Sequence, residues 1–355
     1  YLLDNQENIA NLVKNLYTKE KLLEEINQVR KEIGHEELEI HIKDIYYNEK
    51  EKELWIITQD RPDKSAIIGK GGWVVGKLKE KLKINSIHVE SYGDYLTKEY
   101  KLKLSKKTLD NFSSNLTGIQ NLKKILNTKL ENIYSFDYNS YFKNNTFEES
   151  EKTEAVVALS GGVDSSFSLI LAKYLGFNPI AITIDPGTII LPNQYKRNIK
   201  KLTEELNVDH EYIKADYSEI IRESLNGRFH PCGRCSKHTE ELINQYAINN
   251  NIPIAIFGDM LSTGTQCITL QEKDLYRLNL PASLAVGKQE NKSLSQQFNL
   301  QSFSGFGCPL LYEVHKKYPY LKKYSIQRIL RETRSSALEV GEALDLIWSF
   351  YNTKD

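Results

Sequence analysis

Residues 155–166 read AVVALSGGVDSS, and this stretch decides the fold. The apolar run Ala155–Leu159 is typical of a strand that is buried on both faces of a parallel sheet. It passes directly into Ser160–Gly162, where two adjacent glycines allow a tight turn and let several N–H groups point into one concavity. A helix starting near Ser165 would direct its positive end at the same place. The loop therefore predicts a phosphate site.

The loop differs from two widespread phosphate-binding motifs. It has no lysine in the Walker position and no G-x-G-x-x-G pattern, so neither a P-loop kinase nor a dinucleotide-binding domain fits. Asp164 is unusual in an anion site unless it holds Mg²⁺ or orients a departing pyrophosphate. The alternative interpretation is a tight strand–helix turn with a capping serine.

This run resembles the S-G-G-x-D-S signature of the PP-loop ATP pyrophosphatase superfamily. The resemblance implies an ATP site that splits the bond between the α- and β-phosphates, adenylates an acceptor and releases pyrophosphate. It also implies that Asp164 acts in catalysis through Mg²⁺, and that a second strand ending at Asp185 lies beside the adenine. Asp185 could instead be a turn residue before Pro186. The residues expected at the ATP site are Ala158, Leu159, Ser160, Gly161, Gly162, Asp164, Ser165, Ser166, Ile184 and Asp185.

The region from Ala155 onward alternates between apolar runs and helical patterns. The runs Ile180–Ile184 and Ile254–Phe257 are further strands, so we expect an α/β fold with a parallel sheet and helices on both faces, of the PP-loop/HUP-like kind. Asp259 follows the last of these strands and would lie at the carboxyl edge of the sheet, where ligands bind. It is a second candidate catalytic residue, and the alternative is a cap for the turn Leu261–Gly264.

Three cysteines form a candidate metal site. Cys232 and Cys235 form a CxxC, whose spacing lets both thiolates reach one metal, and Cys308 lies downstream before a proline. This order resembles the iron–sulfur-dependent tRNA thiolation enzymes of the superfamily, which implies a [4Fe–4S] cluster with one open iron. The alternative is structural zinc with His230 or His238 as fourth ligand.

Two features complicate this site. The thiolation enzymes usually carry a basic residue one helical turn beyond the CxxC, where this chain has Thr239, and their His-and-double-Asp loop is represented only by Gly258-Asp259. The fourth cysteine, Cys267, is interpreted as a buried free thiol, with a persulfide carrier or a fourth ligand as the alternative.

The amino-terminal part contains a candidate RNA module. The loop Gly69, Lys70, Gly71 and Gly72 precedes an amphipathic helix, and a G-x-x-G loop lets a nucleic-acid backbone approach closely. Between Arg61 and Lys107 there are 12 basic and 5 acidic residues, a local basic excess. The segment resembles a KH domain, of the strand-first prokaryotic type. A glycine-rich turn on a lysine-rich surface is the alternative.

We expect four segments. They are an N-terminal helical segment (1–34), a small α+β KH-like domain (36–105), a helical and linker segment (106–150) and the PP-loop sulfurtransferase domain (151–355). Two strands are expected at Leu38–Ile42 and Leu54–Thr58, and a linker at Ser135–Lys152.

The composition limits the choice of partners. The chain has 355 residues with 47 basic and 47 acidic side chains, so its net charge is zero and does not favour any particular class of partner. No apolar stretch could span a membrane and no leader opens the chain, so we expect a cytoplasmic protein that binds no membrane. Four cysteines in a chain this long are no disulfide framework.

These observations lead to one functional hypothesis. The chain is expected to be an ATP-dependent tRNA sulfurtransferase, with ATP, Mg²⁺ and a [4Fe–4S] cluster, whose partners are tRNA and a sulfur donor, either sulfide or a carrier protein. A homodimer is compatible with the sequence. Two alternatives stay open: an adenylating ligase of the same superfamily that transfers nitrogen and carries structural zinc, and a non-catalytic RNA-binding protein with a relic nucleotide site.

Overall fold

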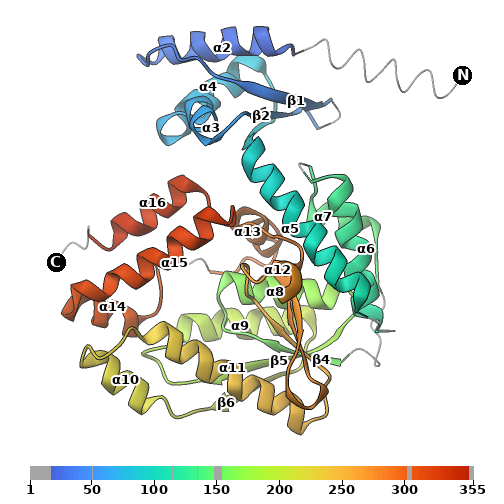
Figure 1. Cartoon of the computed structure of the whole chain (residues 1–355), viewed down its shortest axis with the longest axis vertical. Helices are drawn as coiled ribbons and strands as arrows, with labels where there is room; N and C mark the ends of the chain where they lie inside the picture. The colour runs from blue at the N-terminus through green and yellow to red at the C-terminus, as the bar shows by residue number, and fades with distance from the viewer. Residues whose placement is uncertain are drawn as a thin grey trace, which may run out of the picture. The chain divides into compact units, whose positions relative to one another are not determined.

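The computed structural model describes residues 17–49, 51–112, 116–133, 135–147, 154–301 and 306–351 (Figure 1). The chain divides into two compact units, Tyr1–Lys98 and Glu99–Asp355. The start of the expected N-terminal helical segment, the end of the expected linker and Gly305 lie outside the described residues. The four expected segments stay a prediction, but most of the expected linker segment belongs to the same compact unit as the phosphate loop.

The first unit is a three-stranded sheet packed against helices. The strand order is β1-β2-β3, with β1 antiparallel and β3 parallel to β2. Leu22 and Ile26 of the first described helix are buried in one core with Ile56 and Leu78, so this helix completes the sheet's hydrophobic core. The elements are α2 (Lys19–Glu32), β1 (Ile42–Asn48), β2 (Glu53–Thr58), α3 (Arg61–Ile68), η1 (Lys70–Gly72), α4 (Trp73–Leu82) and β3 (Ser86–Ser91).

The first strand lies further along the chain than the sequence predicts. The expected run was Leu38–Ile42, but β1 begins at Ile42 and pairs with β2 in a register that runs from Ile42↔Thr58 to Asn48↔Glu53. The pairing cannot extend beyond Ile42 toward Leu38, because its partner strand β2 ends at Thr58. Two residues later Asp60 caps helix α3 by accepting a hydrogen bond from the backbone N–H of Asp63. Within the expected KH-like segment (36–105) the first element is the strand β1, and α2 lies in the expected N-terminal helical segment (1–34); the KH assignment itself stays a prediction.

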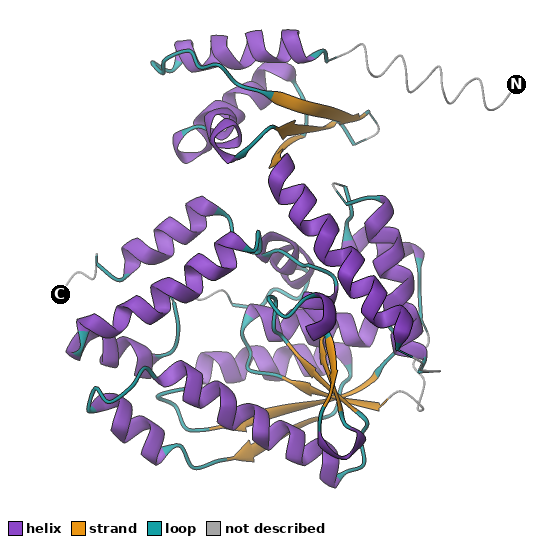
Figure 2. Ribbon diagram, in the orientation of Figure 1, coloured by secondary structure: helices purple, strands orange, loops and turns teal. Residues whose placement is uncertain are grey.

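The second unit is built on a six-stranded sheet of order β6-β5-β4-β7-β9-β8 with helices on both faces (Figure 2). Among the described strands of this sheet, only the pairing of β8 with β9 is antiparallel, which confirms the expected α/β class. The strands are β4 (Glu154–Ala158), β5 (Asn178–Asp185), β6 (His210–Lys214), β7 (Ile254–Phe257), β8 (Ile268–Leu270) and β9 (Tyr276–Asn279).

The helices of this unit alternate with the strands between β4 and β7, and further helices precede and follow that region. The helices of the unit are α5 (Tyr92–Asn111, which begins in the first unit), α6 (Thr117–Glu131), α7 (Tyr138–Asn144), α8 (Val163–Tyr174), α9 (Asn193–Leu206), α10 (Ser218–Leu225), α11 (Pro231–Asn249), α12 (Leu280–Ser283), α13 (Lys288–Gln296), α14 (Pro309–Lys317), α15 (Lys322–Arg334) and α16 (Val340–Ser349).

The expected linker is partly helical. Helix α7 forms inside it because Asp137 caps the helix, accepting a hydrogen bond of 2.7 Å from the backbone N–H of Ser140, and because Tyr138 and Tyr141 are buried. The many asparagines and serines suggested a loop, whereas the tyrosines determine the structure.

The sheet brings three loops to one edge. β4 lies between β5 and β7, and all three strands are parallel, so the loops that follow Ala158, Asp185 and Phe257 start at the same carboxyl edge. This is the edge at which open parallel sheets bind ligands.

Candidate active site

The loop between β4 and α8 has a tightly constrained backbone. Gly161 has a φ of +75°, and a Cβ atom there would lie 2.5 Å from the carbonyl oxygen of Tyr195 and 3.1 Å from the side chain of Ile199, both on α9. Only glycine satisfies the conformation and the space at once. The backbone N–H of Leu159 donates to Ile182 of β5 at 2.9 Å, which fixes where the loop leaves the sheet.

Serine hydroxyls line the inside of this loop. Ser165 accepts a hydrogen bond from the backbone of Ser160 at 3.1 Å, its Oγ lies 3.0 Å from the Ser160 hydroxyl, and it donates to the carbonyl of Gly162 at 3.1 Å. The Ser166 hydroxyl is buried and has no hydrogen-bond partner among the described residues. The loop thus has the glycines, hydroxyls and helix start that a phosphate site requires.

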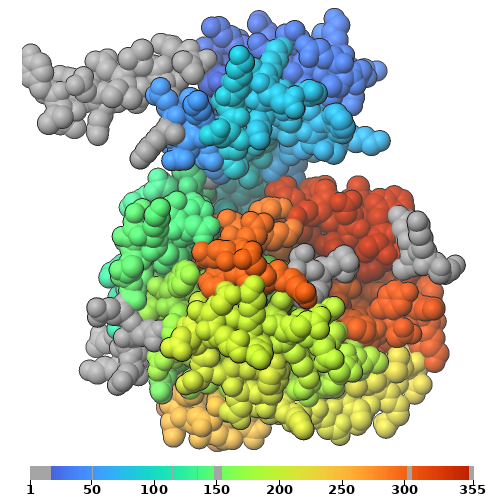
Figure 3. Space-filling model, turned by 180° about the vertical axis from the view of Figure 1, so that it is seen from behind, coloured from blue at the N-terminus to red at the C-terminus, as the bar shows by residue number. Residues whose placement is uncertain are grey.

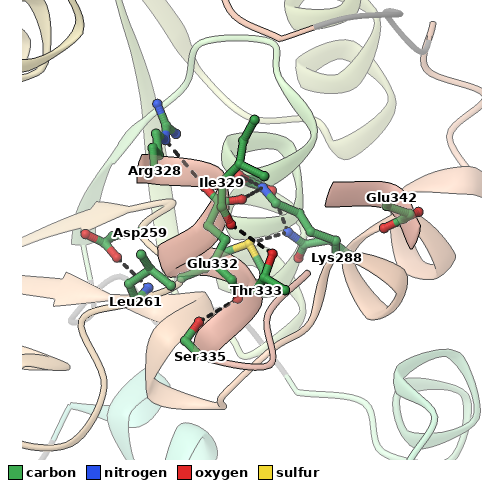
Figure 4. Close-up of polar contacts among 12 residues, drawn as sticks. Asp259, Leu261, Lys288, Arg328, Ile329, Glu332, Thr333, Ser335 and Glu342 are labelled. Atoms are coloured by element: carbon green, nitrogen blue, oxygen red, sulfur yellow. Dashed lines mark hydrogen bonds and ion pairs between the residues drawn. The ribbon is translucent and has the colours of Figure 1, made fainter. Parts of the chain in front are cut away.

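Asp164 is held by two residues of α13. Asn291 Nδ2 donates to Asp164 Oδ1 at 2.8 Å, and Lys288 Nζ lies 2.5 Å from Asp164 Oδ2. Lys288 Nζ also lies 4.0 Å from a carboxylate oxygen of Glu332 on α15 (Figure 4). The sequence gives no sign of these contacts, because Lys288 and Asn291 are 124 and 127 residues from Asp164.

Asp259 caps its own loop. Its carboxylate accepts hydrogen bonds from the backbone N–H groups of Leu261 at 2.7 Å and Ser262 at 3.0 Å, and from the Ser262 hydroxyl at 3.0 Å (Figure 4). The preceding Gly258 packs against the start of α8, where a Cβ would lie 3.0 Å from the backbone nitrogen of Ser165. The carboxylate therefore lies in the loop beside the phosphate loop, in the capping arrangement that the sequence offers as the alternative.

Asp185 ends β5 and pairs with α9. Lys196 Nζ donates to its carboxylate at 2.6 Å and the backbone of Gly187 donates at 3.1 Å. Burial alone would raise the pKa of the Asp185 carboxyl, but these hydrogen bonds and the charge of Lys196 hold its pKa below the ordinary value. Ile184 beside it is buried and pairs with Ile213 of β6.

The three candidate cysteines lie at the starts of two helices. Cys232 and Cys235 belong to the first turns of α11, which begins at Pro231 because proline suits the first helical position. Cys308 is the N-cap of α14, and the backbone N–H groups of Leu310 and Leu311 lower its pKa, although burial raises it more. Helix starts stabilise negative charge on sulfur.

The thiols of this site are mutually coupled. Burial raises the pKa of Cys232 to about 11, partly opposed by the charge of Arg328. Burial raises the pKa of Cys235 to about 12, and negative charge on Cys232 and on Cys308 raises it further. Each of the three thus lies near enough to another to affect its ionisation. Among the described residues, however, no three His, Cys, Asp or Glu side chains gather closely enough to hold one metal ion.

Arg328 brings a positive charge near the CxxC, although its position in the sequence gives no sign of this. It belongs to α15, its charge acts on both Cys232 and His230, and its Nε lies 3.4 Å from Glu332 (Figure 4). His230 in turn lies 2.9 Å from the hydroxyl of Ser325, so the histidine is already hydrogen-bonded.

Tyr195 connects the cysteines to the phosphate loop. Its backbone carbonyl packs against Gly161. Burial raises the pKa of its phenol, and negative charge on Cys308 raises that pKa further.

Cys267 lies apart from the three candidate cysteines in its contacts. It is buried, its thiol hydrogen-bonds Ser105, and burial raises its pKa to about 11.

Three glycines of the G-x-x-G loop in the first unit have positive φ values. The loop lies between α3 and α4, and Gly69, Gly71 and Gly72 have φ values of +73°, +62° and +76°. The ring of Trp73, which follows the loop, is 65% exposed.

Comparisons with known proteins identify the family. Residues 154–268 match the family model of the queuosine biosynthesis protein QueC. The uncharacterized protein MJ1638 of Methanocaldococcus jannaschii is 32% identical over 255 residues, which cover 72% of this chain and 94% of that protein.

Two further matches are more distant. The tRNA-specific 2-thiouridylase MnmA of Persephonella marina is 21% identical over 41% of this chain and 51% of its own length. The U34-tRNA thiolase NcsA from Methanococcus maripaludis, solved with its [4Fe-4S] cluster, aligns with a TM-score of 0.36 at 15% identity, over 73% of this chain and 78% of that one. No described helix is both long and apolar enough to cross a bilayer. The chain belongs to the same family as MJ1638, within the PP-loop ATP pyrophosphatase superfamily.

Proposed function

We propose that this protein is an ATP-dependent tRNA thiolation enzyme. The observation that carries the proposal is the position of Tyr195, whose backbone carbonyl packs against Gly161 of the phosphate loop while its phenol lies near enough to Cys308 for charge on that thiol to raise the phenol's pKa. Cys235 also packs in one hydrophobic cluster with Ile184 and Phe257, near the ends of β5 and β7. These contacts support an arrangement in which the candidate ATP site and the three candidate thiols lie close together in one compact unit. The distant sequence match to MnmA, which is named as a tRNA-specific 2-thiouridylase, agrees with this proposal.

The phosphate loop would bind ATP. The backbone of Ser160–Gly162 and the hydroxyls of Ser165 and Ser166 would hold phosphate at the start of α8. The buried Ser166 hydroxyl, which has no partner among the described residues, fits such a ligand. Ala158, Leu159 and the end of β5 at Ile184 and Asp185 would line the adenosine.

The first step makes a leaving group from the RNA base. A base carbonyl oxygen attacks the α-phosphorus of ATP, the bond to the β-phosphate breaks, and pyrophosphate leaves. Asp164 would hold Mg²⁺, which supplies positive charge for the departing pyrophosphate when bound. In the second step sulfide attacks the activated carbon, the carbon–oxygen bond breaks, and AMP leaves with the oxygen. With sulfide as donor there is no net oxidation or reduction.

Cys232, Cys235 and Cys308 would hold a [4Fe–4S] cluster. The three thiols are coupled, yet no three ligands gather around one ion in the described part of the chain. Such a cluster binds each cysteine through a different iron, so it suits thiols spread more widely than a zinc site does. When bound, the cluster would offer one iron without a protein ligand, to which a sulfur can bind. Two helix starts and Arg328 would stabilise its negative charge.

The first unit would bind the RNA. Its αββααβ order places Gly69–Gly72 between two helices, as in a KH domain, with Lys70 in the loop. Because glycines carry no side chains, the RNA backbone could approach this loop closely, and the exposed ring of Trp73 could stack on an unpaired base.

A nitrogen-transferring ligase is the second candidate. The match to QueC over residues 154–268 favours it, because that segment includes the phosphate loop and the CxxC. It leaves Cys308 outside, however, and Cys308 is one of the coupled thiols.

Metal analysis of cysteine variants tests the proposal. Iron, acid-labile sulfide and zinc are measured per chain after anaerobic purification, for the wild type and for Cys232→Ser, Cys235→Ser and Cys308→Ser. The buried thiol of Cys267 provides the matched control, Cys267→Ser. We expect about four irons in the wild type and in the control, and loss of iron in the other three. A wild-type protein that binds zinc and no iron would support the ligase instead.

A further inference from the structure

The side chain of Lys288 occupies an unusual electrostatic position. Its ammonium contacts Asp164, which is the second residue of α8, so a cation lies at the positive end of a helix. Cations are unfavourable there unless anions compensate. Asp164 at 2.5 Å and Glu332 at 4.0 Å provide that compensation (Figure 4).

The contact is accessible to a ligand. The side chains of Lys288 and Asp164 are 20% and 29% exposed, so solvent reaches the pair. Figure 3 shows the orange segment that holds α13 at the surface beside the red C-terminal helices. The same helix start lies at the end of the Ser160–Gly162 loop, so a phosphate chain that extends from this loop toward Asp164 would approach the ammonium of Lys288.

We propose that Lys288 is a binding residue for the β- and γ-phosphates of ATP, and that it rests on Asp164 while the site is empty. The inference rests on the proposed function in taking ATP as the ligand. When Mg²⁺ and ATP bind, Asp164 releases the ammonium of Lys288 and binds the metal ion instead. The released ammonium then binds phosphate oxygens of ATP. Every charge keeps an opposite partner before and after the exchange, and no covalent bond changes.

The surrounding contacts leave the helix in place while the side chain moves. The backbone N–H of Lys288 donates to Ala337 at 2.8 Å, and Glu290, two residues later, pairs at 2.6 Å with the fully buried Lys129. Asn291 is also buried and holds one oxygen of Asp164, which leaves the other oxygen for Lys288 or for the metal.

Lys292 provides a matched control. It belongs to the same helix, one turn further on, and its Nζ lies 2.5 Å from Glu342 of α16. Replacing either lysine by alanine therefore removes one positive charge and one close ion pair from α13, and for Lys288 also the 4.0 Å contact with Glu332, but of the two only Lys288 contacts Asp164.

The test measures binding of ATP, pyrophosphate and AMP by calorimetry in the presence of Mg²⁺. A hydrogen bond to a charged group corresponds to a roughly 10- to 100-fold change in affinity. Lys288→Ala should therefore lower the affinity for ATP and for pyrophosphate by that factor and leave the affinity for AMP unchanged. Lys288→Arg should retain most of the affinity, and Lys292→Ala should bind all three like the wild type. Retained AMP binding also shows that the variant folds.

A second measurement uses Mn²⁺ alone, detected by its magnetic resonance signal. Because Lys288 competes with metal for Asp164, Lys288→Ala should bind Mn²⁺ more tightly than the wild type without nucleotide. Unchanged affinity for ATP and pyrophosphate, or an equal loss for AMP, would overturn the inference and leave Lys288 a structural residue. A wild-type protein that binds no ATP would overturn the proposed function, and this inference with it.

Discussion

Gly161→Ala is expected to destabilise the second unit and to abolish ATP binding. Gly161 has a φ of +75°, and the added methyl carbon would lie 2.5 Å from the carbonyl oxygen of Tyr195 and 3.1 Å from Ile199 Cγ1. The nearest obstacle is helix backbone, which cannot rotate away as a flexible side chain can. Either α9 shifts or the phosphate loop opens.

The expected loss in the free energy of unfolding is the sum of a backbone contribution and a packing contribution. The left-handed conformation costs an alanine about 1–2 kcal/mol. Overpacking against α9 adds about 1–3 kcal/mol. Together they predict a loss of about 2–5 kcal/mol in the free energy of unfolding. For a unit of this size that corresponds to a fall of roughly 4–20 °C in melting temperature.

The assay compares this variant with Gly162→Ala. Gly162 has a φ of −79°, which alanine adopts freely, and its Cβ would lie 3.6 Å from the Ser160 hydroxyl, an ordinary contact. Thermal melting by circular dichroism should show the loss for Gly161→Ala and none for Gly162→Ala. Equal melting temperatures, together with retained ATP binding in Gly161→Ala, would refute the geometry described for this loop.

Four further predictions concern single side chains. Asp164→Asn should still bind ATP but release no pyrophosphate, because it loses the proposed metal ligand; wild-type release would exclude that role. Lys70→Glu should weaken tRNA binding and lower the slope of log affinity against log salt concentration by about one unit, with ATP affinity unchanged; an unaltered slope would contradict the KH assignment. Burial lowers the pKa of His315 to about 4, so its neutral form is needed in the folded state. Stability should therefore be intact above pH 6.5 and fall by about 2 kcal/mol by pH 5 in urea unfolding, and His315→Gln should flatten that loss. In the cluster-free protein, partial burial raises the pKa of Cys232 from 9.0 to about 11, so iodoacetamide should alkylate it roughly 100-fold more slowly at pH 7 than an ordinary thiol, and rapid labelling would contradict the raised pKa.

Local sequence patterns predicted the features that depend on neighbouring residues. The apolar run before Ser160 and the paired glycines locate a strand, a turn and a helix, because each depends on residues adjacent in the chain. The alternation of apolar and helical patterns predicted the parallel sheet for the same reason. Strands β6 and β9 were missed because His210–Lys214 and Tyr276–Asn279 are short and contain charged or polar residues.

Contacts between distant segments could not be predicted from the sequence. Lys288 lies 124 residues from Asp164, and nothing in its own neighbourhood marks it as a partner of the phosphate loop. The same holds for Arg328, which brings a positive charge near Cys232 from a helix almost 100 residues further along the chain. Asp259 is the converse case: its position at the sheet edge was correctly inferred, but its oxygens are engaged by Leu261 and Ser262.

Reconstituted thiolation tests the central claim most directly. Anaerobically purified protein is incubated with ATP, Mg²⁺, sulfide and unmodified tRNA, and the digested nucleosides are analysed by mass spectrometry while AMP and pyrophosphate are quantified. We predict a thionucleoside that forms in equal amount to AMP and is absent when ATP, tRNA or Cys308 is removed. ATP cleavage that yields no thionucleoside, or a product that has gained nitrogen in place of oxygen, would contradict the account.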